Sequence, residues 1–246
     1  MSASDEANVA SATYREIKRR IVELHYGVGE RLSEARLASD LKVGRSPVRT
    51  ALSRLKSEGW IAISPQSGTY VKAMTPRDIR ELTELRMLLE MRAAGDAATR
   101  MTDSALKTLR ADFRLQSRAI AKGNVDAFIS LDNHLHAAIY DAADNGLIRQ
   151  ILLDLRDKVQ WIRRVCSVSI ERTQDGLEEL RCILIALERR DEARAAQAMR
   201  DHVQSAAAFC ERLEGIADEP TVAGRPLREG RSPARFEGYA DHGDGT

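Results

Sequence analysis

The chain has 246 residues and a net charge of +1, and its 43% hydrophobic and 4% aromatic content favours a two-domain, mostly helical protein over a β-sandwich. Basic residues gather in 1–74, where twelve Lys and Arg face eight Asp and Glu. Three cysteines without C-x-x-C spacing imply neither a disulfide framework nor a thiolate zinc site. The N-terminus has acidic residues where a signal peptide needs basic ones, and no apolar run approaches the ~20 residues that span a bilayer, so we expect a cytoplasmic protein without membrane contact.

The N-terminal part of the chain carries the pattern of a small domain over residues 10–74, after a stretch at 1–9 that we expect to be flexible. Apolar residues at helical spacing predict a first helix from Thr13. A short second helix follows, and Ser33 can cap its start with a side-chain oxygen. Two helices in this order precede the most informative segment of the chain.

The third helix follows a short turn, and we predict that Ser46 caps it and that Pro47 lies in its first turn. Arg45 and Arg49 then flank a helix N-terminus, which favours phosphate, and arginine can read guanine through two parallel hydrogen bonds. Two short strands around residues 65–68 predict a hairpin, which completes a winged helix-turn-helix. The alternative interpretation of the basic face is an ordinary solvated helix surface.

The rest of the chain shows helical periodicity without strand signals. Thr75 can cap and Pro76 can begin the first helix. The helical stretches are 77–100, 103–122, 125–143, 147–167, 173–190 and 191–212. They predict an all-α bundle of six to seven helices over 75–214. Residues 215–246 are rich in Gly, Pro and charge, and we expect a disordered tail there.

The stretch RLSEARLASDLKVGRSPVRTALSRLKSEGWIAISPQSGTYV, residues 31–71, resembles the winged helix-turn-helix of GntR-family transcriptional regulators. The resemblance implies that Arg45 and Arg49 contact double-stranded DNA and that the wing tip approaches the minor groove. The candidate DNA-binding residues are Arg36, Arg45, Ser46, Arg49, Thr50 and Ser53 on the helices, and Gln66, Ser67 and Gly68 in the wing.

Two positions depart from the family's pattern. Ala35 stands where the family has a DNA-contacting arginine, and the arginine is displaced to Arg36, which rotates the side chain by roughly 100° on a helix. Gly44 stands where the family has Ser or Thr, so a hydroxyl that could bond a phosphate is missing. We therefore expect Arg45 and Arg49 to carry more of the recognition.

In the helical half, Asp132 and His136 are four residues apart, so they share one helix face and suit two ligands of one divalent metal. His202 on the last helix could supply a third ligand. An ordinary pair of helix residues without a metal is the alternative.

Residues 77–213 resemble the effector-binding FCD domain of the FadR subfamily, in Glu84-Leu85-Arg86, LDNHLHAAIYDAADN and ALERRDEARAAQAMRDHV. The resemblance implies one divalent metal, Zn, Mn or Ni, held by Asp132, His136, His202 and a further histidine. Leu180 occupies the position of that histidine. Two outcomes stay open: a three-ligand site completed by water or an effector carboxylate, or no metal.

The resemblance also implies a small organic acid as effector. Its candidate contacts are Arg86, Asp132, His136, Arg163 and His202. Arg86 could instead pair with Glu90 on the next turn, and either Arg163 or Arg164 could face the cavity. His134 should point away from the site.

We therefore expect a homodimeric transcription factor, a repressor, whose helical domain binds a small carboxylate and rearranges two DNA-reading heads on a palindromic operator. One alternative is a metal-dependent enzyme, although the sequence lacks H-E-x-x-H, nucleophile-elbow and phosphate-loop motifs. The other is an interaction module that does not bind DNA.

Overall fold

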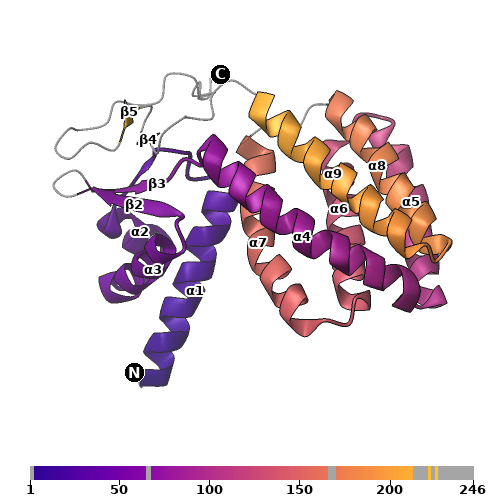
Figure 1. The fold of residues 1–246 in the computed structure, drawn as a ribbon. Coiled ribbons are helices and arrows are strands. Elements are labelled where there is room, and N and C mark those ends of the chain that lie inside the picture. Colours follow the sequence, from indigo (N-terminus) through magenta and orange to yellow (C-terminus); the bar gives the residue numbers. More distant parts are fainter. Residues whose placement is uncertain (1–2, 65–67, 166–169, 213–220, 223–224, 227–246) are drawn as a thin grey trace. The chain divides into compact units, whose positions relative to one another are not determined.

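The computed structural model describes residues 3–64, 68–165, 170–212, 221–222 and 225–226 (Figure 1). The chain divides into two compact units, with the division after Pro76. Mainly helical structure with one small three-stranded sheet confirms the predicted fold class. None of the helices in these ranges is long and apolar enough to cross a membrane.

The N-terminal unit is a winged helix-turn-helix. Its elements are α1 (Ala3–Val22), β1 (Arg31–Leu32), α2 (Glu34–Leu41), α3 (Arg45–Ser57), β2 (Ile61–Ser64) and β3 (Gly68–Val71). The antiparallel sheet has the order β1-β3-β2, so β1 adds a strand to the predicted hairpin. Ile17 and Ile21 of α1 are fully buried, as are Val48 and Leu55 of α3, which explains why α1 and α3 pack together.

The starts of the first three helices test the predicted caps. Helix α1 begins at Ala3, before the predicted start at Thr13, so it includes most of the stretch that we expect to be flexible. Ser33 caps α2, as expected, by accepting a hydrogen bond from the amide of Arg36. The predicted cap at Ser46 was wrong, because Gly44 is the N-cap and α3 begins at Arg45.

The extended backbone of Gly44 turns the chain into the helix without help from a side chain, so Ser46 already lies inside the first turn. Pro47, the third helical residue, fits there because the first four amides of a helix have no acceptor within it.

The second unit is a bundle of six helices in its described part. They are α4 (Pro76–Arg100), α5 (Asp103–Ile120), α6 (Val125–Ala142), α7 (Gly146–Val165), α8 (Ile170–Glu188) and α9 (Glu192–Arg212). Helix α8 begins three residues earlier than predicted. The principal packed pairs are α8 with α9 and α5 with α6. Most of the predicted tail lies outside the described residues. In its described part, β4 (Thr221–Val222) pairs antiparallel with β5 (Arg225–Pro226).

Small residues let the helices of the bundle approach closely. Ala93 and Ala97 of α4 are fully buried. A Cβ added to Gly176 of α8 would lie 2.5 Å from the ring of Phe128 on α6. Glycine is therefore required at this α6–α8 contact.

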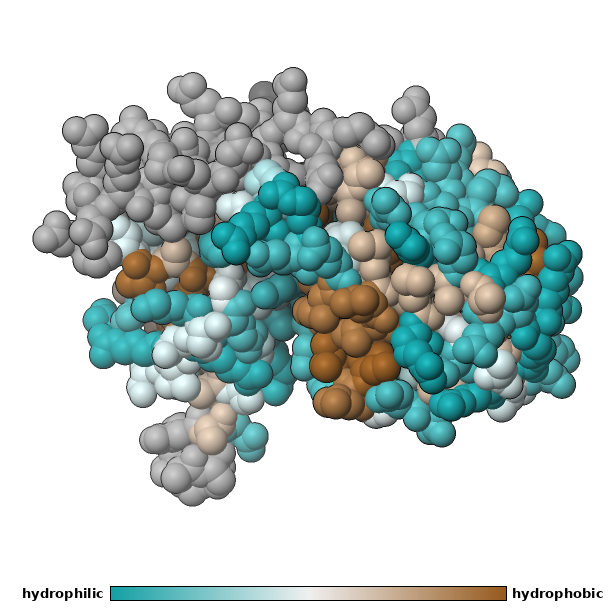
Figure 2. All heavy atoms as spheres, viewed as in Figure 1, coloured by the Kyte–Doolittle hydropathy of each residue, from teal (hydrophilic) through white to brown (hydrophobic). Residues whose placement is uncertain are grey.

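One face of the bundle carries an apolar patch, which Figure 2 shows in brown over the region of α7. Leu147, Ile151 and Leu155 are spaced by four residues on this helix and share one face. Leu147 is 73% exposed, and Ile151 and Leu155 are half-buried.

Candidate functional site

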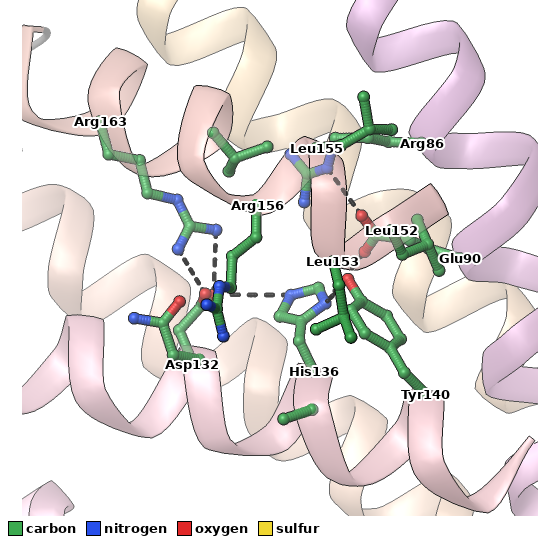
Figure 3. Close-up of a pocket in the computed structure, with 13 residues that line it drawn as sticks. Arg86, Glu90, Asp132, His136, Tyr140, Leu152, Leu153, Leu155, Arg156 and Arg163 are labelled. Carbon is green, nitrogen blue, oxygen red and sulfur yellow. Dashed lines mark hydrogen bonds and ion pairs between the residues drawn. The ribbon is translucent and has the colours of Figure 1, made fainter. Parts of the chain in front are cut away.

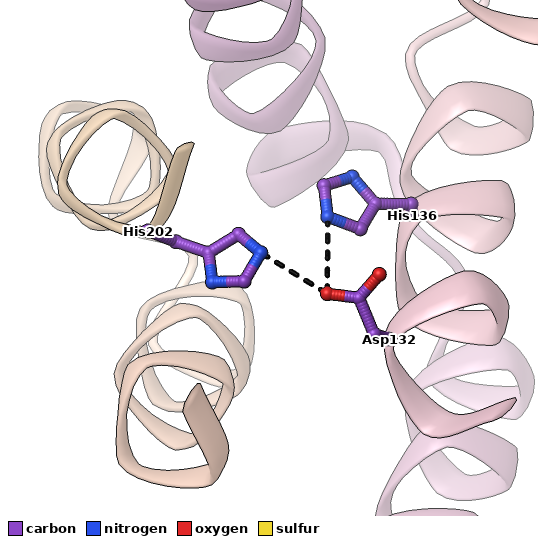
Figure 4. Close-up of side chains that lie close together, drawn as sticks. All are labelled: Asp132, His136 and His202. Atoms are coloured by element: carbon purple, nitrogen blue, oxygen red, sulfur yellow. Dashed lines mark ion pairs between the residues drawn. The ribbon is translucent and has the colours of Figure 1, made fainter. Parts of the chain in front are cut away.

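Asp132, His136 and His202 come together in the interior of the helical unit (Figure 4). Asp132 and His136 lie on consecutive turns of α6, and α9 brings His202 to them. The Oδ1 atom of Asp132 is 3.1 Å from Nε2 of His202 and 3.7 Å from Nε2 of His136. All three residues are buried, and one ligand atom from each lies within 4.8 Å of the others.

The other nitrogen of each imidazole faces an acceptor. Nδ1 of His202 hydrogen bonds to Glu179 Oε2 at 2.8 Å, and Nδ1 of His136 lies 2.9 Å from Glu90 Oε2 and 3.1 Å from the Tyr140 hydroxyl. Acceptors at Nδ1 favour the tautomer with its proton there, which leaves the Nε2 lone pair free. Among the described residues, neither buried Nε2 atom has a hydrogen-bond partner.

Three arginines neutralise the buried carboxylates of the site. Arg163 pairs with Asp132 through both terminal nitrogens, Arg86 donates Nε to Glu90 at 2.7 Å, and Arg172 pairs with Glu179 at 3.0 Å. These pairs keep negative charge beside the imidazoles without leaving it uncompensated.

The charges of this network shift the pKa values of its members. Burial disfavours ionised Asp132, but Arg163 and the two imidazoles outweigh burial and hold its pKa well below the usual value. Burial also opposes the charged form of His202, but Asp132 and Glu179 raise the pKa of this imidazole above its usual value. Asp132 is therefore ionised, and its charge together with that of Glu179 favours the protonated form of His202.

Leu180 gives the site no polar atom. Its side chain is fully buried in the hydrophobic core of the bundle. The preceding residue, Glu179, contacts His202 from the Nδ1 side, away from the point where the two Nε2 atoms meet. In the described part of the chain, the group that could hold a metal ion therefore consists of three residues, Asp132, His136 and His202.

A pocket of about 420 Å³, including its open part, adjoins this cluster (Figure 3). Asp132 and His136 form its floor with Arg86, Arg156 and Arg163, and α7 contributes apolar side chains. Four of the predicted effector contacts therefore line one pocket: Arg86, Asp132, His136 and Arg163. His202 is not among the described lining residues, but it contacts Asp132, which is.

The predicted DNA-reading residues on helices are exposed. Arg45, Ser46, Arg49, Thr50 and Ser53 follow one side of α3, and Arg36 lies on α2. Gly68 begins β3 with a φ of +120°, a conformation that favours glycine. Gln66 and Ser67 lie outside the described residues.

The comparisons with known proteins agree for both units. Residues 9–71 match the family described as bacterial regulatory proteins, gntR family, and residues 81–205 match the FCD domain. The chain is 30% identical to the HTH-type transcriptional repressor RspR of Escherichia coli K12, over 78% of this chain and 84% of that protein.

The chain belongs to the GntR family. It is also 30% identical to the Nta operon transcriptional regulator of Aminobacter aminovorans, over 58% of this chain and 67% of that one. Its fold is that of E. coli McbR/YncC, with a TM-score of 0.70 and 20% identity over 83% of this chain and 97% of that one. This GntR-family protein is therefore a DNA-binding transcription regulator and not an enzyme.

Several residues of this GntR-family site were missed in the sequence. Glu179 and Arg172 of α8 reach the cluster only through the packing of helices, so spacing could not reveal them. Tyr140 lies four residues after His136 on α6, and this helical spacing could have indicated it. Glu34 of α2 accepts a hydrogen bond from Arg49 Nε at 2.8 Å. Arg31 lies against Gly68, the residue that follows the turn of the wing, and adds a basic group there.

Two open alternatives are resolved by the geometry. Arg86 both pairs with Glu90 and lines the pocket, so the two roles proposed for it are compatible. Arg163 lies in the pocket, whereas Arg164 is exposed. His134 is also exposed and pairs with Asp112 at 3.0 Å.

Proposed function

We propose that the helical unit holds one divalent metal ion through Asp132, His136 and His202. The observation that carries the proposal is the convergence of two buried Nε2 atoms, each facing Asp132 Oδ1 without a hydrogen bond among the described residues, on one carboxylate oxygen. Two imidazoles and a carboxylate suit Zn²⁺, Mn²⁺ or Ni²⁺. The carboxylates at the two Nδ1 atoms orient the rings, which is the usual second contact of a metal-binding histidine.

A small organic acid is the effector that this pocket favours. Its lining contains three guanidinium groups, from Arg86, Arg156 and Arg163, and two carboxylates, from Glu90 and Asp132. The three guanidinium groups outnumber the two carboxylates by one positive charge, which an anionic ligand would balance. A bound metal would attract the same carboxylate as a Lewis acid.

The N-terminal unit would read DNA through the exposed face of α3. Arg45 is the first residue of α3, and Arg49 lies one turn further along the helix. The first backbone amides of the helix have no acceptor within it, so they favour a phosphate group. The hydrogen bond from Arg49 to Glu34 uses Nε, which leaves the terminal nitrogens to face a guanine.

The protein would act as a homodimer on a palindromic operator in the cytoplasm. The apolar face of α7, led by Leu147, supports self-association because a face of this kind is stabilised by burial. The same helix lines the effector pocket through Leu152 and Arg163, so a ligand can alter the dimer and its two DNA-binding units. We infer repression from the name of the relative RspR.

Titration calorimetry with Zn²⁺, Mn²⁺ and Ni²⁺ tests the metal site. The wild-type protein should bind one equivalent, and His202→Gln should abolish that binding. His134→Gln is the matched control, because it removes an exposed imidazole from α6 and should change nothing. Equal binding by all three proteins would refute the site.

Fluorescence anisotropy on duplexes selected from a random pool tests the DNA contacts. Arg49→Ala should lose roughly 1 to 3 kcal/mol of specific binding, the value of one bidentate base contact. Lys56→Ala, an exposed basic change at the other end of α3, should keep the specificity. Wild-type specificity in Arg49→Ala would exclude Arg49 from base recognition.

The dimer has its own test. Leu147→Glu should shift the protein toward monomer in analytical ultracentrifugation. Leu115→Glu on α5, where the leucine is 66% exposed, is the control and should leave the mass unchanged. A dimer that survives Leu147→Glu would place the interface elsewhere.

A further inference from the structure

A second hollow opens beside the effector pocket within the helical unit. It has a volume of about 350 Å³, including its open part, and is bounded by α4, α7 and α9. Arg86, Val159 and Arg163 line both hollows. The two spaces are therefore neighbours that share a wall, with guanidinium groups in it.

The second hollow, which we call the apolar chamber, differs in chemistry from the first. Apart from the shared residues its walls are Ile79, Leu82, Thr83, Ile162, Ala206, Ala207 and Cys210. Apart from the two arginines, these residues contribute no ionisable side chain other than the thiol of Cys210. Two consecutive alanines on α9 leave space where larger side chains would fill it.

The shared arginines would hold a ligand at the boundary between the two spaces. In Figure 3 both side chains reach the pocket, Arg86 from α4 and Arg163 from α7. The described contacts of Arg86 with Glu90 use Nε, and a guanidinium group has five N–H donors, so donors remain for a ligand carboxylate. A carboxylate held there can extend an attached group into the apolar chamber.

The chamber distinguishes between classes of organic acid. An apolar substituent gains by leaving water at about 25 cal/mol per Å² of surface. A hydroxylated chain would place hydroxyl groups against Ile79, Leu82 and Ile162, which cannot pair with them, and an unpaired buried hydroxyl is costly.

We propose that the effector is a monocarboxylate with a compact apolar substituent, whose carboxylate lies at Arg86 and Arg163 and whose substituent fills the apolar chamber. This proposal rests on the proposed function, because it assigns the ligand class of the same sensing unit. Both volumes include space that is open to solvent, so the two hollows suit a small metabolite rather than a long lipid.

The test measures dissociation constants of the full-length protein by calorimetry, with and without Zn²⁺. The ligands are straight-chain acids from acetate to octanoate, gluconate as the hydroxylated acid, and hexanamide as the uncharged analogue of hexanoate. Affinity should rise about threefold to fourfold for each methylene that enters the chamber, and then level off. Gluconate and hexanamide should bind at least tenfold more weakly than hexanoate.

Two variants locate the apolar part of the ligand. Ala207→Leu fills the chamber and should abolish the gain with chain length while acetate binding persists. Ala208→Leu makes the same change at a half-buried neighbour outside the chamber lining and should retain the gain.

The outcomes separate this proposal from the proposed function. Tight gluconate binding with no dependence on chain length would overturn the apolar chamber and keep an organic-acid sensor. Equal binding of hexanoate and hexanamide would overturn the placement of the carboxylate at the arginines. An unchanged chain-length gain in Ala207→Leu would also overturn the chamber. Failure of every acid, with and without Zn²⁺, would overturn both proposals.

Discussion

The buried pair of Arg86 and Glu90 should contribute far more to stability than a pair of the same geometry at the surface. Helix α4 contains both cases. Arg86 and Glu90 are four residues apart with an Nε–Oε1 distance of 2.7 Å, and Arg77 and Glu81 have the same spacing and the same distance. The side chains of the first pair are 9% and 1% exposed, and those of the second are 80% and 59% exposed.

Glu90→Ala removes the partner of a buried guanidinium group and one neighbour of His136. Breaking a buried ion pair in this way costs about 3 to 5 kcal/mol, because the remaining charge cannot regain its water. Glu81→Ala removes a partner whose arginine is already hydrated, so the free energy of unfolding should not change measurably.

Urea unfolding followed by tryptophan fluorescence measures both values. The chain has two tryptophans, Trp60 in the N-terminal unit and Trp161 in the helical unit, and both are buried. A Trp60→Phe background makes the signal specific for the helical unit. Equal effects of Glu90→Ala and Glu81→Ala on the free energy of unfolding would show that burial does not decide the strength of such a pair.

Three further predictions concern other parts of the molecule. Gly176→Ala should destabilise the helical unit by roughly 1 to 3 kcal/mol in the same assay, because its Cβ would overlap the buried ring of Phe128. Glu179→Gln should weaken Zn²⁺ binding about 10- to 100-fold in calorimetry, because the Glu179 carboxylate orients the His202 ring. Circular dichroism should show little loss of helical content in this variant. Burial opposes the ionised form of Glu58, but hydrogen bonds from Tyr14 and Arg54 lower its pKa in the folded protein. The stability that ionised Glu58 gives the N-terminal unit should therefore be present above the pKa of the unfolded state. It should disappear as the pH falls through the lower pKa of the folded state. When the unfolding temperature is plotted against pH, Glu58→Gln should reduce the decrease at acid pH. An unchanged decrease would show that Glu58 does not cause it.

Periodicity predicted the helices well because each buries one face along its own length. The apolar spacing of Val48 and Leu55 in α3 is an example, and both residues are fully buried. Strand β1 was missed because its two residues are extended only through pairing with β3, which lies far along the chain. The cap at Ser46 failed because Gly44, two residues earlier, already provides the extended backbone.

Only part of the buried cluster could be read from the sequence. Asp132 and His136 share a helix face, so a spacing of four residues was sufficient to pair them. The contact of His202 with Glu179 depends on how α8 packs against α9 and has no local signal. The sequence indicated Glu90 as a helix partner of Arg86. Its contact with His136 depends on how α4 packs against α6, so spacing along one helix could not predict it.

Ligand binding in the helical unit should control DNA binding by the N-terminal unit. The most direct measurement is the anisotropy of a selected duplex, titrated with Zn²⁺-loaded protein with and without the carboxylate that binds most tightly. We predict that the carboxylate changes DNA affinity at least fivefold for the wild type, the lower end of typical allosteric coupling, and has no effect on His202→Gln. A carboxylate that binds the wild-type protein but leaves its DNA affinity unchanged would show that the two units are not coupled.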